Sequence, residues 1–264
     1  MKPLFRPALL ATLLVLLTAT AWAQRGEVIN LPTREGVTQR LLYLGLDAPK
    51  AVAVLLVGGN GGLRIATDGS LGALAGNFLA RTREQFVAHG IAVALVDAPS
   101  DRQTAPYLSG FRQTPEHAAD LKVVIAELRQ RTGRPVVLVG TSRGTQSAAA
   151  VALRLQDEGG PDAVVLTSSI LSDAGGRAVP QMPLETLRIP VLVTHHQEDG
   201  CKLCSYADLP LLVARLPAAH QVLTYQGGRN AGDPCEAMAY HGYNGIEERV
   251  VRDIAQWMLA LAPR

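Results

Sequence analysis

The chain is poor in cysteine, in aromatic residues and in net charge. Three cysteines occur among 264 residues, aromatic side chains make up 5% of the chain, and the formal net charge is +2. A charge this close to neutral gives no reason to expect nucleic acid or an anionic membrane as a partner. With three cysteines there is no second Cys-x-x-Cys pair, which a zinc site built from two such pairs requires.

Long uncharged apolar runs are confined to the N-terminus. Lys2 and Arg6 precede an apolar segment at residues 9–21, and Ala21-Trp22-Ala23 supplies a small-x-small pattern. These features predict a secretory signal peptide over residues 1–23, cleaved after Ala23. A permanent membrane anchor is the alternative, but the run is shorter than the roughly 20 residues that a span requires. We therefore expect a periplasmic or secreted protein with one mature domain over residues 24–264 and no stable membrane insertion after cleavage.

The three cysteines lie in the last quarter of the chain, at Cys201, Cys204 and Cys235. In an oxidising compartment they predict one disulfide and one remaining thiol. The alternative is that Cys201 and Cys204 form a metal-binding or redox pair, although no second pair completes a zinc site.

A short motif near the middle of the chain carries most of the chemical information. An apolar, β-branched run at residues 136–139 leads into Gly140-x-Ser142-x-Gly144, and an alanine-rich segment follows. This order predicts a strand, a sharp turn with a hydroxyl at its apex, and a helix. Glycines are needed on both sides because the strand and helix backbones pass very close together. Ser142 is thus a candidate nucleophile, the alternative being a tight crossover turn with an idle serine.

Apolar strand patterns alternate with helical patterns along the rest of the chain. Two short strands are predicted within residues 26–46. Continuous apolar strands follow at 51–57, 91–96, 136–139, 162–167, 189–195 and 221–225, and helices at 71–89, 114–131, 143–156, 206–215 and 245–261. The alternation predicts an α/β fold with a mostly parallel sheet and helices on both faces, as one domain.

A nucleophilic serine needs a base and an acid that orients the base. Asp199 follows the strand pattern at 189–195, and His241 follows the last one, so both should lie with Ser142 at the carboxyl edge of the sheet. Glu198 and Asp173 are alternative acids, and His241 has the alternative of an ordinary exposed loop histidine. The neighbouring histidines, His195 and His196, are more readily explained by loop packing than by metal binding together with Glu198.

With the elbow motif and the chain order Ser142, Asp199, His241, the sequence resembles the α/β-hydrolase superfamily, over about residues 26–262. It is most similar to the small, secreted, lidless esterase-like members. The resemblance implies an eight-stranded sheet and hydrolysis through an acyl-enzyme. Ser142 would attack the acyl carbon, His241 would transfer the proton, and Asp199 would orient the imidazole.

The resemblance also implies two N–H donors for the developing oxyanion. One is the backbone of Arg143. The other lies in the glycine-rich run at residues 58–62, with Asn60 preferred and Gly61 as the alternative. A phosphate-binding role for this run is less favoured because it lacks the Gly-x-Gly-x-x-Gly spacing and the Gly-Lys-Ser ending.

A disulfide between Cys201 and Cys235 would tie the acid loop to the histidine loop and hold both triad members in register. Cys204 in place of Cys201 is the alternative pairing.

The segment at residues 172–188 is too short for a helical cap, so we predict an open pocket. Its expected walls are Leu63, Arg64, the 100–113 loop, Ile170-Leu171, Tyr240 and Tyr243. The leading hypothesis is a carboxylic ester hydrolase acting on a small-molecule acyl substrate, without cofactor or metal. Peptidase, thioesterase or acyltransferase activity and a catalytically silent binding protein are the alternatives. The oligomeric state is left open by the sequence.

Overall fold

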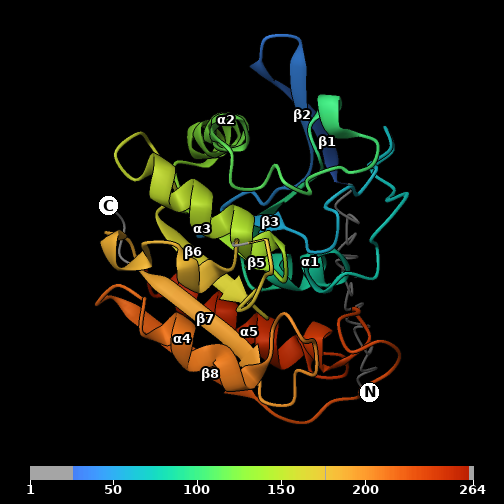
Figure 1. The fold of residues 1–264 in the computed structure, drawn as a ribbon. Coiled ribbons are helices and arrows are strands. Elements are labelled where there is room, and N and C mark those ends of the chain that lie inside the picture. The colour runs from blue at the N-terminus through green and yellow to red at the C-terminus, as the bar shows by residue number, and fades with distance from the viewer. Residues whose placement is uncertain (1–25, 176, 262–264) are drawn as a thin grey trace, which may run out of the picture.

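In the computed structural model, the structure describes residues 26–175 and 177–261. The predicted signal peptide lies outside these residues. Within them, one sheet of eight strands runs in the order β1-β2-β4-β3-β5-β6-β7-β8. The strands are β1 (Glu27–Arg34), β2 (Val37–Leu44), β3 (Ala51–Leu56), β4 (Ile91–Val96), β5 (Val136–Thr141), β6 (Ala163–Thr167), β7 (Val191–His196) and β8 (His220–Tyr225). Figure 1 shows the β1–β2 hairpin at one end of this sheet and β8 at the other.

The sheet is parallel from β4 to β8, and β2 runs antiparallel to both of its neighbours, β1 and β4. Every residue of β3, β4 and β5 is buried, because helices cover both faces of the sheet. This explains why these strands have continuous apolar sequences rather than alternating ones. The predicted α/β class, the eight strands and the mostly parallel arrangement are confirmed.

Two apolar clusters, one on each face, form the core. In β5, Val136 and Leu138 join the first cluster, whereas Val137 and Val139 join the second, as the two-residue period of a strand requires. The first cluster packs under α2 (Pro115–Thr132), α3 (Gly144–Leu155) and α4 (Leu209–Val213), and the second under α1 (Phe78–Ala88) and α5 (Glu247–Leu259).

The helix predicted over residues 71–89 begins only at Phe78. Leu74 has a left-handed φ of 54°, and Leu71 forms an antiparallel bridge with Ile65, so this segment follows a loop path. Asn77 then caps α1 by accepting a hydrogen bond from the Leu79 N–H. The helical interpretation of the apolar spacing at residues 71–77 was therefore wrong. Leu71 and Leu74 lie in a loop.

The helix predicted over residues 206–215 is also shorter than expected. A 3-10 turn at Tyr206–Asp208 precedes α4, which covers only Leu209–Val213. Residues 172–188, apart from Gly176, form loops and two 3-10 turns, Val179–Gln181 and Leu184–Thr186. Among the described residues, no helix combines the length and apolarity that a membrane crossing demands.

Candidate active site

Ser142 lies at the apex of a strained turn between β5 and α3. Its φ is +52°, a conformation that non-glycine residues rarely adopt. The backbones on either side are in close contact: a Cβ on Gly140 would lie 2.5 Å from the Gly144 carbonyl oxygen, and one on Gly144 only 1.9 Å from that of Leu56. The two glycines of the motif therefore meet a steric requirement, and the turn lifts Ser142 above the strand ends.

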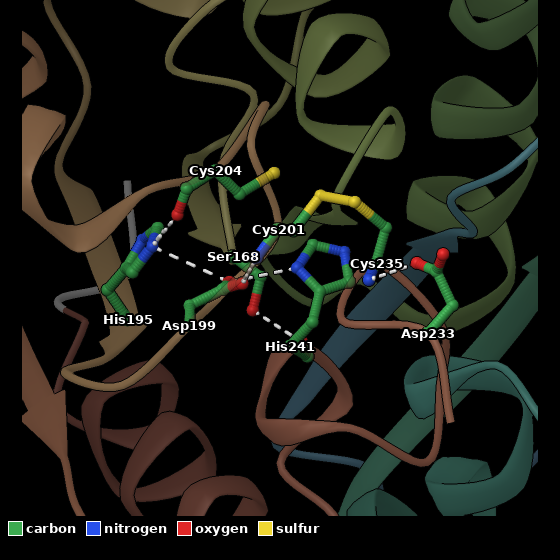
Figure 2. Close-up of a disulfide and its surroundings, with 8 residues drawn as sticks. All are labelled: Ser168, His195, Asp199, Cys201, Cys204, Asp233, Cys235 and His241. Carbon is green, nitrogen blue, oxygen red and sulfur yellow. Dashed lines mark hydrogen bonds and ion pairs between the residues drawn. A yellow bond between two sulfur atoms is a disulfide. The ribbon is translucent and has the colours of Figure 1, made fainter. Parts of the chain in front are cut away.

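Asp199 and His241 come from loops after β7 and β8, and their side chains face one another (Figure 2). His241 Nδ1 lies 2.8 Å from Asp199 Oδ2. The Asp199 side chain is fully buried, and its other oxygen accepts a hydrogen bond from the Cys201 backbone N–H. The carboxylate thus sets the orientation of the imidazole and leaves Nε2 to face the pocket.

Hydrogen bonds from residues at the ends of β6 and β7 hold the backbone of the loop that carries His241. Ser168 Oγ donates a hydrogen bond of 2.7 Å to the His241 carbonyl (Figure 2). The buried hydroxyl of Tyr243 donates to the Thr194 carbonyl and accepts from the Ser168 N–H. A Cβ on Gly242 would lie 1.9 Å from the Ala237 carbonyl oxygen, so the loop closes tightly on itself. Together these contacts fix the backbone that carries the imidazole.

The two alternative acids lie elsewhere. Asp173 Oδ2 is 3.1 Å from the Gln146 side-chain nitrogen and 3.5 Å from the Arg143 guanidinium. Hydrogen bonding to the Gly175 N–H lowers the pKa of Asp173. Glu198 is exposed, whereas Asp199, its neighbour, points inward. Of these three carboxylates, only Asp199 is hydrogen-bonded to His241.

The adjacent histidines are both engaged by the backbone. His195 Nε2 lies 2.7 Å from the Cys204 carbonyl and 3.7 Å from Asp199 Oδ2. Burial lowers the pKa of His195, so it is neutral at pH 7. His196 accepts a hydrogen bond from the Glu198 N–H at Nδ1, and its Nε2 contacts the Gly227 carbonyl. The two histidines are the last two residues of β7, so their prediction as loop residues was wrong, and their rings pack against main-chain carbonyls of the neighbouring loops.

Cys201 and Cys235 form a disulfide, the pairing that was favoured (Figure 2). Cys204 stays a buried free thiol. The ligand atoms of Cys201, Cys204 and His241 lie within 4.8 Å of one another. However, the Cys201 sulfur is already bonded to Cys235 and offers no thiolate. Burial raises the pKa of the Cys204 thiol and keeps it protonated.

Ser142 and His241 line one pocket of about 280 Å³. Its other walls are Gly59, Thr141, residues 74–78, residues 235–237 and Gly242. The predicted walls were wrong. Leu63, Ile170, Leu171 and Tyr243 are buried in the packed interior, and Tyr240 stacks on His196 with 4.4 Å between ring centroids. Arg64 and the 100–113 loop do not line this pocket either.

The segment at residues 74–78 is the part of the site that sequence reasoning missed. The helix predicted over residues 71–89 leaves no loop there to form a wall of the pocket. The sequence holds a signal for a loop in this segment, because glycines and a capping residue favour a loop before the helix. These residues are Gly72, Gly76 and the cap Asn77.

The glycine-rich run after β3 passes directly beside the serine. A Cβ on Gly58 would lie 2.8 Å from Ser142 Cβ. Within the described part of the chain, the backbone N–H groups of Asn60, Gly61 and Arg143 donate no hydrogen bond to protein atoms. These include both predicted oxyanion donors, Asn60 and Arg143, together with the alternative, Gly61. The run therefore passes beside Ser142 at Gly58 and carries N–H groups without a described protein acceptor at Asn60 and Gly61.

Comparison with protein-family models and with curated protein sequences finds no significant match. Comparison with solved structures finds many similar folds at low sequence identity. A lidless α/β serine hydrolase from Xanthomonas campestris has a TM-score of 0.60 and 12% identity, with 90% of this chain and 97% of that chain covered. A Pyrococcus furiosus esterase has a TM-score of 0.61 and 13% identity, with 88% and 91% covered.

The esterase domain of a Rhodothermus marinus protein is similar over 89% of this chain and 98% of its own, with a TM-score of 0.57 and 13% identity. Matches of this extent cover most of the chain. At these identities they establish the architecture and leave the chemistry to the site itself. The chain therefore has the α/β-hydrolase fold.

Proposed function

We propose that this protein is a serine hydrolase that cleaves carboxylic esters through an acyl-enzyme on Ser142, His241 and Asp199. The observation that carries the proposal is the buried 2.8 Å contact between His241 and Asp199 at the edge of a pocket that Ser142 also lines. A buried carboxylate on Nδ1 favours the tautomer whose Nε2 accepts a proton. An idle serine would not require a φ of +52° at the apex of such a turn.

The proposed reaction follows from these positions. His241 Nε2 accepts the hydroxyl proton as Ser142 Oγ attacks the acyl carbon, and Asp199 stabilises the imidazolium. The N–H groups of Arg143 and Asn60 receive the oxyanion. The imidazolium then protonates the departing alkoxide, and water attacks the acyl-enzyme with His241 again as base. No step requires a cofactor.

The pocket also bears on the substrate. Its volume of about 280 Å³ lies just below the range of about 300–1,000 Å³ that ligand sites span. We therefore propose short-chain acyl esters as the substrate class. The Cys201–Cys235 disulfide and the absence of a spanning helix among the described residues are compatible with the proposed export.

Hydrolysis of p-nitrophenyl acetate by the mature protein, with Ser142→Ala as control, tests the activity. We expect turnover that is lost in the variant, and sulfonyl fluoride labelling that mass spectrometry assigns to Ser142. Labelling of another serine, or equal turnover by Ser142→Ala, would exclude the mechanism. A panel of acetyl, butyryl and palmitoyl esters, thioesters and peptides then tests the substrate class. Faster peptide or thioester cleavage would favour those activities instead.

A further inference from the structure

Arg112 is a buried cation without a carboxylate partner among the described residues. It lies just before α2, is only 5% exposed and takes part in none of the ion pairs found there. Burial, together with the charge of another cation, Arg143, lowers the pKa of Arg112 to about 9. Burying an unpaired charge is costly, so the surrounding groups must stabilise it in another way.

The guanidinium is satisfied mainly by the main chain of the glycine-rich loop after β3. Arg112 Nη2 donates to the carbonyls of Val57 at 3.1 Å and Gly59 at 3.1 Å, and lies 3.5 Å from that of Gly58. These are consecutive peptides, and a fourth is held from the same side, because the Leu108 N–H donates to the Asn60 carbonyl at 3.0 Å.

The other end of the guanidinium is fixed by a buried polar chain. Arg112 Nη1 donates to Ser147 Oγ at 3.1 Å, and the same oxygen lies 3.0 Å from His117 Nε2. Burial lowers the pKa of His117 to about 3, so this ring is neutral at pH 7 and can accept the serine proton. Ser147 is on α3, the helix that follows the nucleophile, so Arg112 links that helix to the glycine-rich loop.

Holding a carbonyl also sets the direction of the adjoining N–H. The only cis bond among the described residues is Ala105–Pro106, so the loop peptides are trans, and in a trans peptide the C=O and N–H point in opposite directions. With the Gly59 carbonyl on Arg112, the Asn60 N–H is turned away from the guanidinium. In the same way, the Leu108 N–H holds the Asn60 carbonyl, so the Gly61 N–H is turned away from Leu108.

We propose that Arg112 is the positioning residue of the oxyanion hole: it holds the carbonyls of the 57–59 segment so that the unpaired N–H of Asn60 faces the Ser142 side of the loop. This inference rests on the proposed hydrolase function. A cation on the carbonyl also polarises the peptide, which strengthens its N–H as a donor. Gly61 fits the same arrangement, since a Cβ there would lie 2.8 Å from Arg112 Nη2.

Steady-state kinetics of Arg112→Met and Arg112→Lys test this role. Removing one oxyanion donor typically lowers kcat by about 10²–10³-fold, so we expect Arg112→Met to lower kcat by about 10²-fold with KM within about twofold. Lysine retains the charge but not the forked geometry that reaches several carbonyls. The kcat of Arg112→Lys should therefore lie between that of Arg112→Met and that of wild type. Arg129→Met is the matched control, because Arg129 also donates to consecutive carbonyls, those of Gly159 and Gly160, in another loop.

Inhibitor binding distinguishes a role in positioning the oxyanion donors from a merely structural role of Arg112. A trifluoromethyl ketone forms a tetrahedral oxyanion on Ser142, and its affinity should fall in parallel with kcat/KM across the variants. The matching methyl ketone should keep its affinity within about twofold. Unchanged kcat in folded Arg112→Met, or equal losses for both ketones, would overturn the proposal. If Arg112→Met does not fold, the same comparison in Arg112→Lys decides. Failure of the proposed function itself would be distinct, because wild-type turnover would then survive Ser142→Ala.

Discussion

Replacing Cys201 and Cys235 together by alanine is expected to lower the free energy of unfolding by about 4 kcal/mol. The two residues are 34 apart in sequence. In the chain-entropy model, closing a loop of that length removes about 12.6 cal/mol/K from the unfolded ensemble, or about 3.8 kcal/mol at 25 °C. Alanine at position 201 keeps the backbone N–H that donates a hydrogen bond to Asp199. The main loss is therefore the cross-link itself.

The same variant should also be a slower enzyme. The bridge joins the loop of Asp199 to the chain that leads into His241, and these two side chains must stay within hydrogen-bonding distance. Misplacement of a catalytic group by about 1 Å can cost about 10²-fold, and we expect a loss of about tenfold in kcat with little change in KM. Urea unfolding and ester hydrolysis, each with and without dithiothreitol, measure the two effects.

Cys204 makes the single variants informative. Its sulfur lies within 4.8 Å of the Cys201 sulfur, so in Cys201→Ala it can pair with Cys235. That variant should regain part of the lost stability under oxidising conditions and lose it again in dithiothreitol. A double variant within about 1 kcal/mol of wild type would refute the entropic argument. Wild-type kcat that is unaffected by complete reduction would refute the link to catalysis.

Three further outcomes are expected. Gly144→Ala places a Cβ 1.9 Å from the Leu56 carbonyl oxygen, so it should destabilise the fold by at least about 3 kcal/mol, and a urea midpoint equal to that of wild type would contradict the packing at the elbow. Asp199→Asn should lower kcat by about 10⁴-fold while circular dichroism stays unchanged, and a loss below about tenfold would remove Asp199 from the triad. Burial lowers the pKa of His117 to about 3 in the folded state from about 6.5 when unfolded, so between these two pH values it is mainly the unfolded chain that binds this proton. Stability should therefore fall as pH drops from about 6.5 towards 3, by up to about 1.4 kcal/mol per pH unit from this group, and His117→Gln should remove that part of the slope measured by urea unfolding.

The architecture was readable from the sequence because its signals are local. The strands of a buried parallel sheet must be apolar along their whole length, so β3, β4 and β5 could be located without any knowledge of their neighbours. The elbow motif is also short in sequence, although Gly144 is required by a contact with the distant Leu56 carbonyl as well as by the turn itself. The order of strands then placed Asp199 and His241 at the same sheet edge as Ser142.

Long-range packing decided the rest. Leu71 and Leu74 have a spacing that suits a helix, yet they belong to a loop. Residues 74–78 line the pocket together with residues 235–237. Only the folded chain showed which carboxylate is hydrogen-bonded to His241, because Asp199 and Glu198 are adjacent in sequence and differ only in the direction of their side chains. Likewise, nothing in the 100–113 loop distinguishes Arg112 from other arginines. Its contacts are with main-chain carbonyls more than 50 residues away. Every residue has such a carbonyl, so the amino-acid sequence does not indicate which ones accept these hydrogen bonds.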